Sequence, residues 1–282
     1  MDAKTLTKLD QPEILAAIFH PRSEEKNATP QSCKEFEIAI PDDQVKLGCR
    51  FYSRNSEAAN IVYFHGNGET VADYDQIAPF YLDAGLNILI ASYRGYGWSS
   101  GNPTVSTLFH DSGIVLNSFI RYCEDNGLSE DIFVMGRSLG SASCIDIGYN
   151  LPERIKGIII DSGFANTLPL AARLGYDVSR SGLTEDDCFN NVEKIKAIEL
   201  PTLILHGAED QLIPLHEAVK LQAESGAKNK QLFVIPGADH NSLISRGGDT
   251  YFETIRNFTD TVSNRNTWRQ RRKKFKSQEG RR

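Results

Sequence analysis

Long apolar runs are absent from this 282-residue sequence. No stretch approaches the roughly 20 apolar residues of a membrane-spanning helix. The apolar run near the N-terminus, Ile14–Phe19, follows Glu13 and is shorter than the about 7–15 residues of a signal-peptide core. These absences argue against a secreted or membrane-spanning chain, and we expect a cytoplasmic protein.

Cysteine is also scarce. The five cysteines are odd in number, widely spaced and without a C-x-x-C pair: Cys33, Cys49, Cys123, Cys144 and Cys188. This pattern favours free thiols in a reducing compartment over a disulfide framework or a zinc site. We therefore predict no metal and no cofactor.

Charge is unevenly distributed along the chain, and its C-terminal end is strongly basic. The whole chain carries −6, whereas residues 265–282 hold nine Lys and Arg and one acid, so that this tail carries +8 and the remainder −14. Because an acidic body repels nucleic acid, no nucleic-acid partner is expected. The basic tail, in which Trp268 and Phe275 are seven residues apart, is either a solvated helix end or a site of weak contact with an anionic membrane.

The chain does contain a regular alternation of strand and helix patterns. Residues 33–53 alternate apolar and polar positions around Pro41-Asp42-Asp43, which predicts an antiparallel hairpin. Further strands rich in Ile, Val and Leu are expected at 61–64, 87–92, 132–135, 155–160, 202–205 and 231–235. Helices are expected at 71–84, 105–126, after 138, at 215–223 and from about 250. The pattern predicts an α/β fold with a mostly parallel eight-stranded sheet and helices on both faces.

Three regions follow from this pattern. Residues 1–32 form a polar lead-in with a short helix at 13–19, residues 33–264 form the α/β domain, and residues 265–282 form the basic tail. The interval 163–199 is too long for a simple crossover and contains helix-like patches at 168–174 and 192–198. We expect residues 163–191 to form a small helical cap over the carboxyl ends of the strands, where open α/β sheets bind ligands.

The most informative stretch is Asp131–Leu151. An apolar run ends in the turn Gly-Arg-Ser-Leu-Gly at 136–140, and small and apolar residues continue at helical spacing. A strand, a glycine-flanked serine and a helix are the context in which G-x-S-x-G presents a strained, exposed serine as a nucleophile. Ser138 is therefore the candidate nucleophile, provided that a base, an acid and an oxyanion site accompany it.

A serine hydroxyl needs a base to accept its proton, and an acid must orient that base. His240 is the candidate base because its loop leaves the last strand at the edge where Ser138 lies. Asp210, which follows the penultimate strand, is the preferred acid, and Asp161, which also follows a strand, is its rival. Asp239 adjoins His240 and is expected to be a turn residue. The other histidines are expected to orient loops (His65, His206) or to be structural or surface residues (His20, His110, His216).

Backbone amides are the expected oxyanion donors, since they need no reorganisation when charge develops. One is the amide of Leu139, and the other belongs to Asn67 or Gly68 in the loop H-G-N-G-E at 65–69. Two glycines in this loop would permit close approach to a substrate carbonyl. A phosphate-binding loop is the competing reading, but the Lys-Ser/Thr of a P-loop and the third glycine of a dinucleotide site are missing.

Together, G-x-S-x-G, the H-G-N-G loop, H-G-x-x-D-x-x-I-P around Asp210, the G-x-x-H loop and the order Ser-Asp-His resemble the α/β-hydrolase superfamily. Residues 92–101, S-Y-R-G-Y-G-W-S-S-G, resemble Y-R-G-Y-G-x-S-x-G of its compact small-cap branch, which includes membrane-anchored serine hydrolases and lysophospholipase-like enzymes. The resemblance spans about residues 33–262. Many relatives have an acid at the position of Ser92, a departure that concerns local loop contacts and leaves the three candidate residues intact.

The resemblance implies a serine hydrolase that cleaves a carboxylic ester or thioester through an acyl-enzyme intermediate on Ser138. A small-molecule or lipid-like acyl substrate is expected. The alternatives are an acyltransferase or a peptidase using the same three residues, and a catalytically silent binding protein with the same fold.

Overall fold

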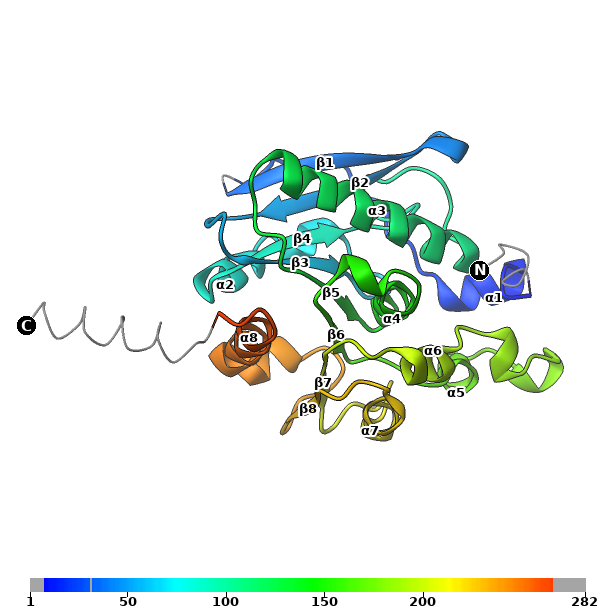
Figure 1. Cartoon of the computed structure of the whole chain (residues 1–282). Helices are drawn as coiled ribbons and strands as arrows, with labels where there is room; N and C mark the ends of the chain where they lie inside the picture. Colours follow the sequence, from blue (N-terminus) through cyan, green and yellow to red (C-terminus); the bar gives the residue numbers. More distant parts are fainter. Residues whose placement is uncertain (1–7, 31, 266–282) are drawn as a thin grey trace, which may run out of the picture.

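The computed structural model describes residues 8–30 and 32–265 (Figure 1). One sheet contains eight strands in the order β1-β2-β4-β3-β5-β6-β7-β8. The hairpin of β1 (Cys33–Ile40) and β2 (Val45–Tyr52) is antiparallel, and β2 also pairs antiparallel with β4 (Leu86–Ala91). All other pairings are parallel. They involve β3 (Ala59–Phe64), β5 (Ile132–Arg137), β6 (Gly157–Asp161), β7 (Thr202–Gly207) and β8 (Lys230–Ile235). The predicted sheet and its N-terminal hairpin are confirmed.

Helices cover both faces of the sheet, and each face has its own apolar core. Within β3, Val62 and Phe64 pack toward α3 (Val105–Asp125) and α4 (Gly140–Asn150), whereas Ile61 and Tyr63 pack toward α2 (Ala78–Asp83) and α8 (Leu243–Val262). Figure 1 shows α2 and α8 together on one side of the sheet, with α6 (Asn191–Ala197) and α7 (Leu215–Glu224) on the side of α4. A strand covered on both faces is apolar throughout, which is why these strands read as continuous Ile/Val runs.

Two helix predictions were wrong in their bounds. The helix expected at 71–84 is a short 3-10 helix, η3 (Val71–Tyr74), followed by α2, whose first turn contains Pro79. The last helix begins at Leu243, earlier than about 250, because a kink at Gly248, with φ of 49°, interrupts its pattern. Further short 3-10 helices are η2 (Pro41–Asp43) and η4 (Pro152–Arg154).

The cap region contains α5 (Thr167–Arg173) and the 3-10 helices η5 (Val178–Arg180) and η6 (Glu185–Asp187). The lead-in contains α1 (Pro12–Ile18), which lies on the same side of the molecule as α5 in Figure 1. Leu9, Ile14 and Ile18 are buried, so the lead-in packs on the domain more closely than its polar composition indicates.

The predicted basic tail lies outside the described residues except for Arg265. Among the helices that the structure describes, none is both long and apolar enough to span a bilayer.

Candidate active site

Ser138 follows β5 at the turn into α4. Its φ is 51°, in the left-handed region that non-glycine residues seldom adopt, so the strained serine predicted from the motif is confirmed. The two flanking glycines are required by packing. A Cβ on Gly136 would lie 2.1 Å from the carbonyl oxygen of Gly140, and one on Gly140 would lie 2.1 Å from that of Phe64. Strand, turn and helix are therefore tightly packed around Ser138. The side chain is buried, with 8% exposure, and not exposed as the motif predicts, because the lead-in and the cap contribute to the hollow beside it.

Ser138, His240 and Asp210 form a chain of hydrogen-bonded side chains, with His240 in the middle. His240 Nε2 is 3.0 Å from Ser138 Oγ, and His240 Nδ1 is 2.7 Å from Asp210 Oδ2. The other carboxylate oxygen of Asp210 accepts the backbone N–H groups of Leu212 at 3.0 Å and Ile213 at 2.8 Å. Asp210 thereby has fixed partners on both oxygens and can orient the imidazole, and the imidazole in turn can accept the serine proton.

The rival acids are engaged elsewhere. Asp161 accepts the Tyr251 hydroxyl at 2.6 Å and the Ser162 hydroxyl at 3.1 Å, and burial raises the pKa of Asp161. Asp239 accepts the Ser242 hydroxyl at 2.6 Å and the Asn241 N–H at 3.0 Å, which are the contacts of a turn residue. The geometry therefore pairs His240 with Asp210 and not with either neighbour.

The two histidines at strand ends contact loops. His206 Nε2 donates to the carbonyl of Ile213 at 2.7 Å, beneath Asp210, and His65 Nδ1 lies 2.8 Å from the carbonyl of Gly66. Burial lowers the pKa of both rings. Among the remaining histidines, His110 and His216 are half to two-thirds exposed on helices, with side-chain exposures of 49% and 67%.

The loop at 65–69 is held by the lead-in. The Asn67 side chain donates to the carbonyl of Ile18 at 2.7 Å and accepts the Tyr96 hydroxyl at 2.6 Å and the His20 backbone N–H at 2.9 Å. Asn67 and Leu139 line a hollow together with Ser138, whereas Gly68 does not. Gly68 has a φ of 73° and open space around it, so its role is to permit the turn.

The hollow beside Ser138, here named the apolar pocket, encloses about 60 Å³. Its walls come from the lead-in, the cap and the loop after β7, and they include Ile18, Phe164, Leu170, Leu174, Phe189 and Leu212. Ser138 is one of its lining residues, and most of the others are apolar.

A second and larger hollow lies on the side of the sheet covered by α2 and α8. This cleft has a volume of about 720 Å³. Its polar floor contains Glu69, Arg137 and Asp161, and its walls contain apolar residues that include Ile77, Phe80, Leu243, Ile244 and Phe252. Sequence reasoning assigned no role to Glu69 or Arg137, although a charged residue at the end of a buried strand and beside a glycine is a signal of a buried ion pair.

Within the described ranges, no group of three or more His, Cys, Asp and Glu side chains is arranged to hold a metal ion. All five cysteines are free thiols.

Comparisons with known proteins identify the family and the fold of this chain. The family model described as "Hydrolase_4: Serine aminopeptidase, S33" matches residues 55–178 and 170–246. These residues include most of the sheet, the loop at 65–69 and the loop of His240. The chain belongs to this α/β-hydrolase family. The hydrolase is 30% identical to the "Protein bem46" of Schizosaccharomyces pombe over 70% of this chain and 66% of that protein. It is 27% identical to the "Uncharacterized protein YfhR" of Escherichia coli over 85% of each chain.

The hydrolase is also similar in structure to the esterase Pf2001 of Pyrococcus furiosus. The TM-score is 0.69 at 22% identity, and the match covers 86% of this chain and 98% of the esterase. At this identity the likeness shows the fold alone, and it confirms the α/β-hydrolase fold predicted from the motifs. Membership of the family supports hydrolase activity.

Proposed function

We propose that this hydrolase cleaves carboxylic esters or thioesters through a triad of Ser138, His240 and Asp210. The observation that carries the proposal is the continuous set of hydrogen bonds from Asp210 to His240 at 2.7 Å and from His240 to Ser138 at 3.0 Å. A binding protein that had lost catalysis would have no need to keep all three side chains, their distances and a strained serine backbone together.

In the first step, His240 accepts the Ser138 proton as Oγ attacks the substrate carbonyl carbon. The tetrahedral intermediate then collapses, the bond to the alcohol or thiol breaks, and His240 donates the proton to that leaving group. In the second step, His240 removes a proton from water, the resulting hydroxide attacks the acyl carbon, and the carboxylic acid leaves as Ser138 recovers its proton.

The negative oxygen of each intermediate requires donors. We assign this role to the backbone amides of Leu139 and Asn67, because both residues line the hollow at Ser138. Neither amide donates to a protein acceptor in the part of the chain that the structure describes. Of the two residues that the sequence left open, Asn67 is therefore favoured over Gly68.

The apolar pocket supports a small-molecule or lipid-like acyl group as substrate. Its lining area is largely hydrocarbon, contributed by residues such as Leu170 and Phe189. An apolar wall next to the nucleophile favours the acyl chain of an ester or thioester over a charged peptide end.

The test is Ser138→Ala, measured against a series of nitrophenyl esters and acyl thioesters and by labelling with a fluorophosphonate probe. The wild type should turn over esters and become labelled, and Ser138→Ala should lose both, by at least about 10³-fold in kcat. Labelling or turnover that survives in Ser138→Ala would refute the proposal. Acyl transfer to an added alcohol, or faster cleavage of aminoacyl amides than of esters, would favour the acyltransferase or peptidase alternative.

A further inference from the structure

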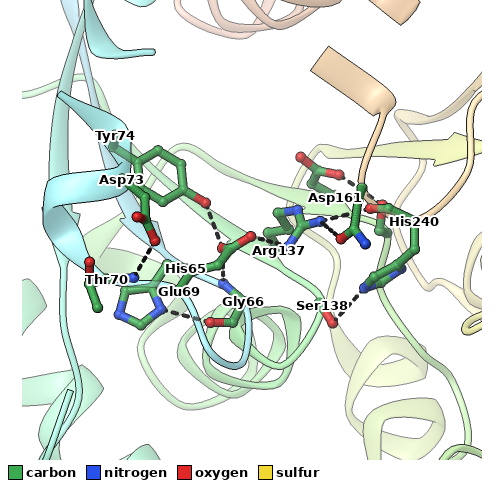
Figure 2. A network of polar contacts seen from close by, with 12 residues as sticks. His65, Gly66, Glu69, Thr70, Asp73, Tyr74, Arg137, Ser138, Asp161 and His240 are labelled. Carbon is green, nitrogen blue, oxygen red and sulfur yellow. Dashed lines mark hydrogen bonds and ion pairs between the residues drawn. The ribbon is translucent and has the colours of Figure 1, made fainter. Parts of the chain in front are cut away.

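Arg137, the residue between Gly136 and Ser138, joins loops that the triad depends on. Its side chain is mostly buried, with 12% exposure, and lies between Glu69 and His240 in Figure 2. One guanidinium nitrogen, Nη1, forms an ion pair with Glu69. The other, Nη2, donates to the backbone carbonyl of His240 at 2.7 Å and to the side-chain oxygen of Asn241 at 3.1 Å. The guanidinium thus holds the main chain of the proposed catalytic base.

Glu69 extends the same network to the oxyanion loop. Its Oε2 accepts the backbone N–H of Gly66 at 2.6 Å and the Tyr74 hydroxyl at 2.8 Å, while its Oε1 pairs with Arg137 (Figure 2). A single, partly buried ion pair therefore connects the loop at 65–69, the nucleophile turn and the loop of His240. These are the three segments whose spacing sets the geometry of the proposed active site.

The absence of a side chain at Gly66 is explained by this ion pair and does not require a substrate. A Cβ at Gly66 would lie 2.6 Å from Arg137 Nη1 and 3.0 Å from Glu69 Oε2. We expected both glycines of H-G-N-G to permit close approach to a substrate carbonyl. For Gly66, the ion pair already explains why a glycine is required. Its missing side chain is the space that the ion pair occupies.

The planar guanidinium is suited to this position. It presents several N–H groups in a fixed fork, so that it can serve a carboxylate and a carbonyl at once, which the single ammonium of a lysine cannot do with the same geometry. Burial lowers the pKa of Arg137, but Glu69, Tyr74, Tyr63 and Asp161 together raise it by more, and the side chain stays charged.

We infer that Arg137, braced by Glu69, is a positioning residue that fixes His240 and the Asn67 loop relative to Ser138. The inference rests on the proposed function for its catalytic consequence, although the network itself is independent of it. Arg137 touches no reacting atom. It acts by holding the His240 carbonyl, so that the ring reaches Ser138 without a search among loop conformations.

The test is Arg137→Lys, which retains the charge and removes the fork. We expect kcat for a nitrophenyl ester to fall about 10- to 100-fold, because small displacements of a catalytic group have effects of this size, while KM changes less than about threefold. Arg50→Lys is the matched control. Arg50 is fully buried and its Nη1 donates to both carboxylate oxygens of Asp75, at 2.7 and 2.8 Å, but its partners belong to neither the triad nor the oxyanion loop. Folded Arg50→Lys should keep the wild-type kcat.

A second measurement does not depend on activity. Hydrogen–deuterium exchange should accelerate at both 65–70 and 239–242 in Arg137→Lys, and at neither segment in Arg50→Lys. If Arg137→Lys does not fold, Glu69→Gln should show the same two changes with a smaller loss of kcat. Unchanged kcat and unchanged exchange in the folded variant would overturn the inference. A failure of the proposed function is detected separately: fluorophosphonate labelling would then survive in Ser138→Ala, whatever the exchange rates show.

Discussion

The two hollows on either side of the Ser138 turn are built from opposite chemistry. The apolar pocket encloses about 60 Å³ and is walled by side chains such as Ile18, Leu170 and Phe189. The cleft measures about 720 Å³ and is lined by partly buried charge, which includes the ion pair of Glu69 and Arg137. Ser138 and Leu139 line the first, whereas their neighbour Arg137 lines the second.

This difference separates two tasks that a serine hydrolase must perform. Apolar walls bind a hydrocarbon chain by removing it from water, and they tolerate changes of shape. A partly buried ion pair such as Arg137–Glu69 contributes little net stability, but it restricts the geometry of the groups that it joins. Under the proposed function, the pocket side is therefore suited to selecting the acyl group, and the cleft side to holding the proposed catalytic groups in place.

The largest expected effect separates the two buried aspartates. Asp210→Asn should lower kcat about 10³- to 10⁴-fold, because an amide no longer holds the His240 ring in the required tautomer. Asp161→Asn, on the cleft floor, should lower kcat less than about tenfold, since Asp161 hydrogen-bonds Tyr251 and Ser162 and not His240. Steady-state kinetics on one nitrophenyl ester measures both.

The same pair of variants can contradict the assignment of the acid to Asp210. A greater loss in Asp161→Asn than in Asp210→Asn would transfer the role of the acid to the cleft side. Both proteins must first be shown to unfold at denaturant concentrations near that of the wild type.

How much the sequence predicts differs along the chain for a physical reason. The strands and Ser138 could be predicted because buried parallel strands and the serine turn impose local patterns on the residues that form them. Gly136 belongs to this class, since a Cβ there would meet the backbone of Gly140, four residues further along the chain.

The residues that escaped prediction act across long separations. Ile18 reaches the apolar pocket, and Arg137 contacts Glu69 and the His240 carbonyl, which lie 68 and 103 positions away in sequence. No local periodicity encodes such contacts. The bounds of α8 were missed for the opposite reason, because the local kink at Gly248 conceals a helix that packing maintains.

A smaller effect is expected when each hollow is filled in turn. Leu170→Trp adds bulk to the apolar pocket and should lower kcat/KM for an octanoyl ester relative to an acetyl ester about tenfold, which corresponds to the loss of one to two methylene sites. Ile244→Trp adds the same kind of bulk to the cleft and should leave this ratio within about twofold.

Leu170 and Ile244 are both half-buried, so the two substitutions are matched in type and exposure. If the cleft received the acyl chain, Ile244→Trp would be the variant that changes the ratio. That result would reverse the assignment of the hollows without affecting the triad.

The smallest expected effect is on stability, and its sign differs between the two sides. Burial lowers the pKa of His206, beneath Asp210, so the native state binds this proton less readily than the unfolded chain, whose value is near 6.5. Its contribution to stability is present above pH 6.5 and is lost as pH falls, by up to about 1.4 kcal/mol per pH unit. His206→Asn should therefore flatten the rise of unfolding free energy between pH 4.5 and 7.5, whereas His216→Asn, at an exposed site, should not.

Asp161 on the cleft floor should act in the opposite direction. Burial raises its pKa above the ordinary 3.8, so the native state binds this proton more tightly than the unfolded chain does. The associated stability is present below pH 3.8 and is lost as pH rises through the native pKa. Asp161→Asn should thus steepen the rise that His206→Asn flattens, as measured by urea unfolding at pH 4.5, 5.5, 6.5 and 7.5. Slopes that change in the same direction in both variants would show that the two sides of Ser138 do not differ in this way.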